Sequence, residues 1–212
     1  MNHPITRRRL ARAGIGLTGL AFAGLRPTRP ARAAGRTAVL GIDADPPTLN
    51  PGLSTEYATG DVGAKIVEAL IWLDRDYAPQ PSLATAWSFS PDGKTFRFTL
   101  RKGVKWHDGH DFSSADVAFT FEQILAKYHP RTSAVLKTIG AAVQTPDPLT
   151  VVFTLQKGYA PFLVQLSVFD APILPRHLYE NTNILANPAN QAPVGTGPYR
   201  FRQWSRGASI RT

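Results

Sequence analysis

The densest group of side chains able to bind a metal ion or to move a proton occupies residues 107–111, in the order His, Asp, Gly, His, Asp. Imidazole and carboxylate groups are donors that Zn²⁺ and related divalent ions take in proteins. A metal site needs three or four side chains that converge on one point, however, and consecutive residues seldom do so. Asp-Gly is also a frequent pair in tight turns. We therefore expect a turn between a strand and a helix, and a secreted metal-dependent hydrolase built around His107 and His110 is the alternative.

Other motifs that carry chemistry are incomplete. Residues 195–199 (GTGPY) contain two glycines of a phosphate-binding loop without the third, and no strand-to-helix context surrounds them. The sequence has no Gly-x-Ser-x-Gly motif and no cysteine, which excludes a nucleophile elbow, disulfides and thiolate metal sites. Its 15 carboxylates single out no catalytic pair. We predict no catalytic residue, no metal and no cofactor, and a turn at 195–199 that leads into a strand over residues 199–204.

Two similar segments in different parts of the chain predict the sheet that would position these side chains. Residues 91–103 (PDGKTFRFTLRKG) and 146–158 (PDPLTVVFTLQKG) match at eight of thirteen positions. Each has a turn followed by a strand in which apolar residues alternate with polar ones. We expect two hairpins, whose first arms are residues 86–90 and 141–145, in one antiparallel sheet with one buried face.

The spacing of apolar residues predicts two helices and a further strand. Ser113 and Asp116 have the spacing of a capping box, and an apolar stripe follows them until His129-Pro130 ends the helix. One helix with a single apolar stripe is unstable alone in water, so we expect it to pack on the apolar face of the sheet. A second helix is expected from about residue 60 to 71, and residues 37–42 (TAVLGI) predict a buried strand.

Basic residues are concentrated at the N-terminus. Seven of the 24 Lys and Arg lie in residues 1–33, which contain no acid, and the remaining chain carries a net charge of +2. A nearly neutral body lacks the cationic surface that nucleic-acid binding requires. Residues 6–10 (TRRRL), an apolar stretch over 13–25 and the small residues of 31–33 (ARA) predict a twin-arginine signal peptide over 1–33. Without cysteine there is no site for a lipid anchor, so we expect a soluble periplasmic protein.

Four blocks of the chain occur in the order of one known family. They are residues 45–51 (DPPTLNP), 83–103 (LATAW, then SPDGKTFRFTLRKG), 105–121 (KWHDG through FSSADVAFTF) and 193–199 (PVGTGPY). Over nearly the whole mature chain they resemble the extracytoplasmic solute-binding proteins of ABC importers, of the dipeptide/oligopeptide/nickel-binding family. The resemblance implies a monomeric receptor, without chemistry of its own, that delivers a peptide or similar small solute to an ABC permease in the inner membrane.

The same resemblance implies a mixed α/β (α+β) fold of the periplasmic-binding-protein type, in which two lobes close on the ligand. Residues 34–58 would form the first strand and cleft loop of lobe one, residues 59–190 its extra hairpin-rich subdomain, and residues 191–212 the return into lobe one. Members of the family are typically more than double this length. We therefore expect the second lobe to be absent from this sequence, as in a fragment of a longer protein or in a truncated, inactive product.

The resemblance places the first-lobe ligand contacts after the first strand, with further contacts after the capped helix and beyond it. On this sequence they are Asp43, Ser54, Thr55, Glu56, Tyr57, Arg131 and Asp170. An amphipathic ring such as that of Tyr57 can cover part of a ligand while its hydroxyl fixes the orientation. The alternative for each of these residues is a solvated loop side chain or a helix cap.

Overall fold

The computed structural model describes residues 38–212, and the chain divides into two units at residues 40 and 41. The signal peptide predicted over residues 1–33 lies outside the described residues. Within residues 38–42 the expected buried strand is absent, and Val39 and Leu40 are 91% and 64% exposed. A strand needs a neighbour for its peptide groups, and no strand of residues 38–212 pairs with this segment. That prediction was wrong.

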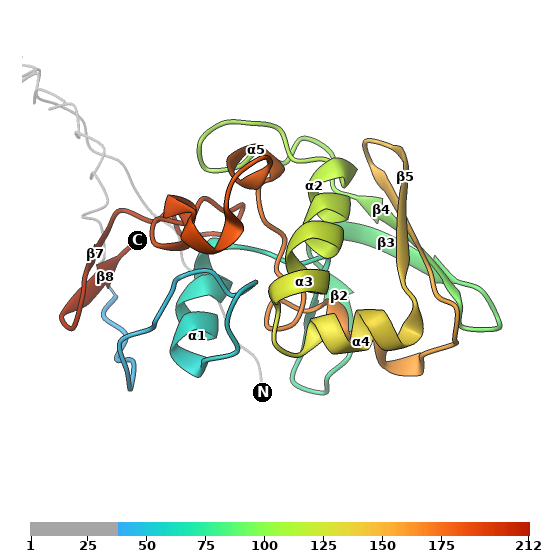
Figure 1. The fold of residues 1–212 in the computed structure, drawn as a ribbon, viewed down its shortest axis with the longest axis horizontal. Helices are drawn as coiled ribbons and strands as arrows, with labels where there is room; N and C mark the ends of the chain where they lie inside the picture. Colours follow the sequence, from blue (N-terminus) through green and yellow to red (C-terminus); the bar gives the residue numbers. More distant parts are fainter. Residues whose placement is uncertain (1–37) are drawn as a thin grey trace, which may run out of the picture. The chain divides into compact units, whose positions relative to one another are not determined.

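Four antiparallel strands form the central sheet of residues 41–212 (Figure 1). They are β3 (Ala84–Phe89), β4 (Thr95–Leu100), β5 (Ala142–Asp147) and β6 (Thr150–Thr154), in the spatial order β3-β4-β6-β5. The register pairs Phe98 of β4 with Val151 of β6 and Phe96 with Phe153, so the two similar segments lie side by side. Both predicted hairpins and the single sheet are confirmed.

One face of this sheet is covered by a continuous helical segment (Figure 1). It consists of α2 (Ser114–Phe119), a π-helical segment η1 (Thr120–Leu125) and α3 (Ala126–Tyr128). The backbone N–H of Ser113 donates to Asp116 Oδ2 at 2.9 Å, which is the reciprocal bond of the predicted capping box. The ring of Phe121 packs edge-on against Phe153 with centroids 4.7 Å apart. The helix start, its end before Pro130 and its packing on the sheet are confirmed, whereas the π-helical segment was not predicted.

Shorter elements complete the cover of the core. They are α4 (Thr132–Ile139), α5 (Arg176–Tyr179) and the 3₁₀ segments η2 (Ala160–Phe162), η3 (Val164–Leu166), η4 (Ile184–Ala186) and η5 (Pro188–Asn190). Helix α4 ends at Gly140, which adopts the left-handed conformation (φ +60°) that glycine reaches without strain. Among residues 38–212, no helix has both the length and the apolar content that crossing a bilayer requires.

The helix expected over residues 60–71 is shorter and begins earlier than predicted. Helix α1 spans Tyr57–Ile66, and the chain then extends into β1 (Ile71–Leu73), which pairs with β2 (Pro79–Pro81). The carbonyl of Ile66 accepts its hydrogen bond from Gly197 N, at 2.9 Å, instead of from a further helical turn. Leu70 and Ile71 are buried as their apolar character requires, but in extended chain.

The C-terminal strand was also misplaced in the prediction. Residues 195–199 do form a turn, but the hairpin that follows consists of β7 (Gln203–Ser205) and β8 (Ser209–Arg211). Tyr199, expected to begin a strand, donates its backbone N–H to Lys65 O at 3.0 Å. The turn therefore continues along the end of α1 before the chain forms the β7–β8 hairpin.

Candidate ligand-binding face

Four of the predicted ligand contacts lie at the N-terminal end of α1. Glu56 holds the N-cap position in extended conformation, and its side chain makes no capping hydrogen bond. Ser54 Oγ accepts from the backbone N–H of Glu56 at 3.1 Å, which fixes the approach to the helix. Thr55, Glu56 and Tyr57 are exposed, and the exposed fraction of Tyr57 is 70%. This end of the helix therefore presents an aromatic ring and a carboxylate to solvent.

Arg131 and Asp170 form an ion pair between two segments that are distant in the chain. Both Nε and Nη2 of Arg131 donate to Asp170 Oδ1, at 2.9 and 2.8 Å. Arg131 Nη2 also donates to the carbonyl of Phe169 at 3.4 Å, and Thr132 Oγ1 donates to the carbonyl of Asp170 at 2.6 Å. The start of α4 is thus tied to the loop that carries Asp170.

Phe169 joins these two groups of residues. A Cβ atom added to Gly60 would lie 2.5 Å from Phe169 Cε1, so the ring lies directly against α1, one helical turn beyond Tyr57. We name the surface formed by Ser54–Tyr57, Arg131, Phe169 and Asp170 the Tyr57–Asp170 face. It contains six of the seven predicted contacts, while Asp43 is exposed in a bend at residues 43–44, outside this set. The role of all seven in ligand binding stays a prediction.

A buried imidazole, that of His129, accepts hydrogen bonds from the backbone beside Arg131. His129 is fully buried, and its Nδ1 accepts from the backbone N–H groups of Arg131 and Thr132, at 3.3 and 3.0 Å. Burial lowers the pKa of His129, and the nearby Asp170 carboxylate opposes that shift only in part. The neutral imidazole therefore caps α4 and sets the position of Arg131.

Sequence reasoning missed both Phe169 and His129 as parts of this face. His129-Pro130 predicts the end of one helix. A histidine shortly before the next helix can also accept hydrogen bonds from the first backbone N–H groups of that helix, and this signal was missed. Phe169 is adjacent to the predicted Asp170, but its contact with Gly60 joins distant positions of the chain and leaves no local pattern.

The cluster at residues 107–111 forms the predicted turn. Gly109, at φ +96°, donates its N–H to Trp106 O at 2.8 Å. The ring of His107 turns away from the other side chains of the cluster: Nε2 lies 2.8 Å from Gly197 O, and Nδ1 accepts from Gly195 N at 3.3 Å. Because both ring nitrogens form hydrogen bonds to Gly195 and Gly197, the role of His107 is to hold the 195–199 turn in place. The hydrolase alternative was wrong in naming it as a metal ligand.

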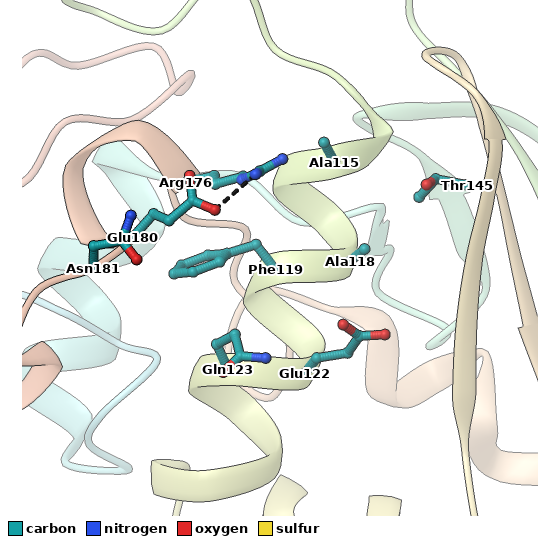
Figure 2. A pocket seen from close by; sticks show the side chains of 9 residues that line it. All are labelled: Ala115, Ala118, Phe119, Glu122, Gln123, Thr145, Arg176, Glu180 and Asn181. Carbon is teal, nitrogen blue, oxygen red and sulfur yellow. Dashed lines mark hydrogen bonds and ion pairs between the residues drawn. The ribbon is translucent and has the colours of Figure 1, made fainter.

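A polar hollow of about 390 Å³ lies between the α2–η1 helix, β5 and α5 (Figure 2). The ion pair of Arg176 with Glu180, 2.7 Å long, borders it, and Phe119 contributes its apolar wall. The lining residues are Ala115, Ala118, Phe119, Glu122, Gln123, Thr145, Arg176, Glu180 and Asn181. None of the predicted ligand contacts lines this hollow, so it is distinct from the Tyr57–Asp170 face.

Known proteins of related sequence include several that are named as binding proteins. The chain is 35% identical to Protein XP55 of Streptomyces lividans over 179 residues, which cover 84% of this chain and 32% of that protein. It is 30% identical to the dipeptide-binding protein of Escherichia coli, covering 95% of this chain and 41% of the relative. The chain thus spans about a third to two fifths of the length of these relatives.

Solved structures agree with this relationship. NikZ from Campylobacter jejuni, in complex with Ni(L-His), superposes with a TM-score of 0.68 at 34% identity, covering 80% of this chain and 33% of that one. The periplasmic binding protein DppA from Helicobacter pylori, in complex with the peptide STSA, gives 0.66 at 29% identity, with 79% and 36% covered. The expected fold type is confirmed, for a portion of the full-length architecture. Residues 78–212 match the model of the bacterial extracellular solute-binding proteins, family 5 (Middle), and the chain belongs to that family.

Proposed function

We propose that the protein is the solute-binding component of an ABC importer and that it binds a peptide or a similar small solute. The observation that carries the proposal is the family membership of residues 78–212, together with relatives named for the binding of dipeptides and glutathione. In such receptors, binding stabilises a closed form because only there does the ligand contact both lobes. Residues 34–58, 59–190 and 191–212 are proposed as the successive parts of lobe one.

The Tyr57–Asp170 face is the proposed first-lobe contact surface. It combines an exposed aromatic ring, a guanidinium and two carboxylates, which suit a ligand with both a peptide backbone and charged ends. The Asp170 side chain is only 28% exposed and is held by Arg131, while Glu56 makes no capping hydrogen bond and Tyr57 is exposed at the helix start. The face thus offers one fixed charged pair beside adaptable groups.

Export and partners are part of the same proposal. The twin-arginine pattern of residues 6–10 and the periplasmic relative from Helicobacter pylori support delivery to the periplasm, and the absence of cysteine in the sequence supports a form without a lipid anchor. The partner would be an ABC permease, which receives the solute unchanged, and the receptor would act as a monomer.

Ligand-induced stabilisation of the purified full-length protein, with both lobes present, tests this function. The four tryptophans report unfolding by fluorescence, with a panel of dipeptides, tripeptides and the nickel–histidine complex as probes. A probe at about 100 times its Kd adds about 2.7 kcal/mol to the free energy of unfolding. We expect at least one peptide to do so without being altered. Hydrolysis of the bound peptide, or no shift with any probe, would contradict the proposal.

Substitutions then test the proposed face. Arg131→Gln and Tyr57→Ala should weaken binding of the active probe about tenfold or more, because a charge-assisted hydrogen bond and a buried ring each contribute more than about 1.4 kcal/mol. Lys105→Gln is the matched control, since Lys105 pairs with Asp111 at 2.6 Å on another part of the surface. Equal loss in the control and in both variants would refute the face as the site.

A further inference from the structure

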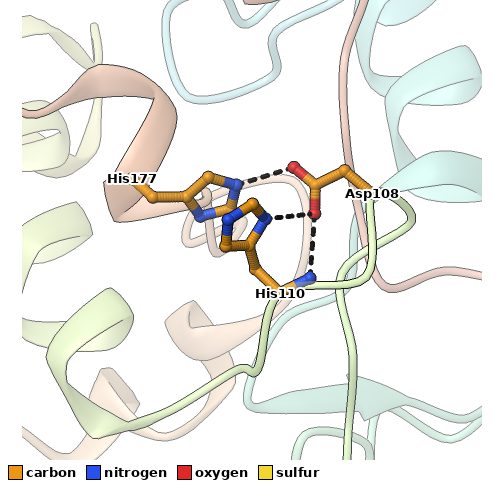
Figure 3. A group of neighbouring side chains, drawn as sticks. All are labelled: Asp108, His110 and His177. Atoms are coloured by element: carbon orange, nitrogen blue, oxygen red, sulfur yellow. Dashed lines mark hydrogen bonds and ion pairs between the residues drawn. The ribbon is translucent and has the colours of Figure 1, made fainter.

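Three side chains outside the Tyr57–Asp170 face converge on one point of the surface: Asp108, His110 and His177 (Figure 3). Asp108 Oδ2 lies 2.7 Å from His177 Nε2, and Asp108 Oδ1 lies 3.2 Å from His110 Nδ1. The two imidazole rings are stacked with centroids 4.1 Å apart and an angle of 26°. The donor atoms of all three residues lie within 4.8 Å of one another, and solvent reaches each residue.

Both elements that carry these side chains are firmly held. Asp108 and His110 lie on the tight turn between Trp106 and Phe112, where Trp106 is 2% exposed and Trp106 N donates to His110 O at 2.9 Å. His177 lies on α5, whose neighbouring Tyr179 is also 2% exposed. The side chains of Asp108 and His177 are 27% and 26% exposed, whereas that of His110 is 64% exposed. Two donors are therefore fixed, and the third can adjust.

We propose that Asp108, His110 and His177 bind one divalent transition-metal ion, of the class of Zn²⁺. Two imidazoles and one carboxylate, with a position left for water, form a donor set that Zn²⁺ takes in proteins. Bonds of about 2.0–2.1 Å in a tetrahedral site place the donor atoms about 3.3 Å apart. Asp108 Oδ1 lies 3.2 Å from His110 Nδ1, close to that value, whereas Oδ2 of the same carboxylate lies 2.7 Å from His177 Nε2, so entry of the ion must separate this second pair. Rotation of the exposed His110 ring brings its Nδ1 atom into bonding distance of the ion, beside His177 Nε2. Each imidazole then carries its proton on its other nitrogen, which faces away from the ion.

The bound ion joins the Trp106–Phe112 turn to α5, two segments that are distant in the chain. This site differs from the metal site weighed from the sequence, because His177 takes the place of His107. It is also separate from the proposed solute-binding face, so it stands whether or not the protein binds peptides.

Calorimetric titration of the metal-free, untagged protein with ZnCl₂ tests the proposal. We expect one equivalent of Zn²⁺ to bind and a rise in melting temperature that EDTA reverses. His110→Asn removes an exposed donor without touching the core, and Asp108→Asn keeps the oxygen that accepts from His110 N at 3.2 Å. Since even outer-shell partners contribute about 10- to 100-fold in metal affinity, each variant should weaken Zn²⁺ binding by about tenfold or more.

Two controls separate this site from other binding. Asp111→Asn alters a carboxylate of the same segment that pairs with Lys105 instead, and Glu122→Gln alters a carboxylate that lines the separate hollow. Both should bind Zn²⁺ like the unaltered protein. Co²⁺ should give visible d–d bands that His110→Asn abolishes while the far-ultraviolet circular dichroism is unchanged. No binding of Zn²⁺, or binding that His110→Asn and Asp108→Asn leave intact, would overturn the proposal.

Discussion

The hairpin sheet and the region around α1 are held together by different kinds of contact. In the sheet, Phe153 lies at the centre of an aromatic group, with ring centroids 5.8 Å from Phe98, 4.7 Å from Phe121 and 5.2 Å from Phe162. Such contacts are individually weak, numerous and non-directional. Loss of one neighbour therefore costs stability in proportion to the volume removed, without altering the topology.

The region around α1 depends instead on a few directional bonds between distant segments. The carbonyls of Lys65 and Ile66 accept from the 195–199 turn, and His107 holds that turn through Gly195 and Gly197. A second, smaller apolar core lies beside α1 and consists of Leu49, Val62, Ile66, Val67, Ile124, Leu174 and Tyr179. In this smaller core the hydroxyl of Tyr179 bonds to Asn50 and Asn190. Directional networks specify one arrangement, and they lose much when a single member is displaced.

The largest effect is expected at the centre of the sheet. Phe153→Ala removes a fully buried ring and leaves a cavity, so the free energy of unfolding should fall by about 3–5 kcal/mol. Phe153→Leu nearly conserves volume and should cost less than about 1.5 kcal/mol. Urea unfolding measures both. A cost below about 1 kcal/mol for the alanine variant would mean that Phe153 is not central to the core.

Gly195→Ala should be almost as costly, through backbone contact rather than a cavity. Its Cβ atom would overlap the carbonyl oxygen of Ile66, so the turn must separate from α1, at a cost of about 3 kcal/mol. Hydrogen exchange should become faster in α1 and stay unchanged in β4 and β6. Gly41→Ala, where nothing lies within 4 Å, is the control. Uniform acceleration over both regions would contradict the division drawn between them.

This contrast explains which parts of the fold the sequence predicts. The sheet and its capped helix follow from local signals, namely the alternation in residues 91–103 and 146–158 and the pair Ser113 and Asp116. The end of α1 at Ile66 is decided by Gly197, near the other end of the chain, so the apolar periodicity predicted a longer helix. The strand expected at residues 37–42 failed for a similar reason, because strand formation depends on a partner elsewhere in the chain.

The candidate sites show the same limit. The resemblance to a known family supplied Ser54–Tyr57, Arg131 and Asp170, but only the structure shows that Phe169 lies against α1 at Gly60 and bonds to Arg131. In the other cluster, the sequence pairs His107 with His110, whereas the structure turns His107 toward Gly195 and Gly197 and stacks His110 on His177. His177 is far from His110 in the sequence and carries no motif that would join the two.

Tyr179→Phe tests the polar network of the smaller core. The hydroxyl donates to Asn190 Oδ1 and accepts from Asn50 Nδ2, both at 3.1 Å, and burial raises the pKa of Tyr179, which keeps the hydroxyl protonated. Its loss leaves buried amide groups short of a partner and should cost about 2 kcal/mol. Tyr159→Phe, whose half-buried hydroxyl contacts Gln165, should stay within about 0.5 kcal/mol. If the two variants lost equal amounts of stability, the buried hydrogen bonds of Tyr179 would contribute no more than the half-buried bond of Tyr159.

The smallest effect is a pH dependence at the edge of the Tyr57–Asp170 face. The pKa of His129 lies below its ordinary value of 6.5 in the folded protein, because burial disfavours the charged ring. Between the folded-state pKa and 6.5 the unfolded chain binds more protons, so stability is complete above this window and declines as the pH falls through it. The decline from one group is at most about 1.4 kcal/mol per pH unit.

A matched variant isolates this contribution from the other histidines. His129→Asn keeps a side-chain oxygen that can accept from the first N–H groups of α4, but it does not titrate. Unfolding in urea between pH 5 and pH 8 should therefore give a shallower slope for the variant than for the unaltered protein. Protonation of His129 also removes the acceptor for Arg131 N, at 3.3 Å, so exchange of the Arg131 and Thr132 amides should quicken over the same window. Identical slopes in the two proteins would show that the pKa of His129 is not lowered in the folded protein, and that the face is not linked to the charge of this ring.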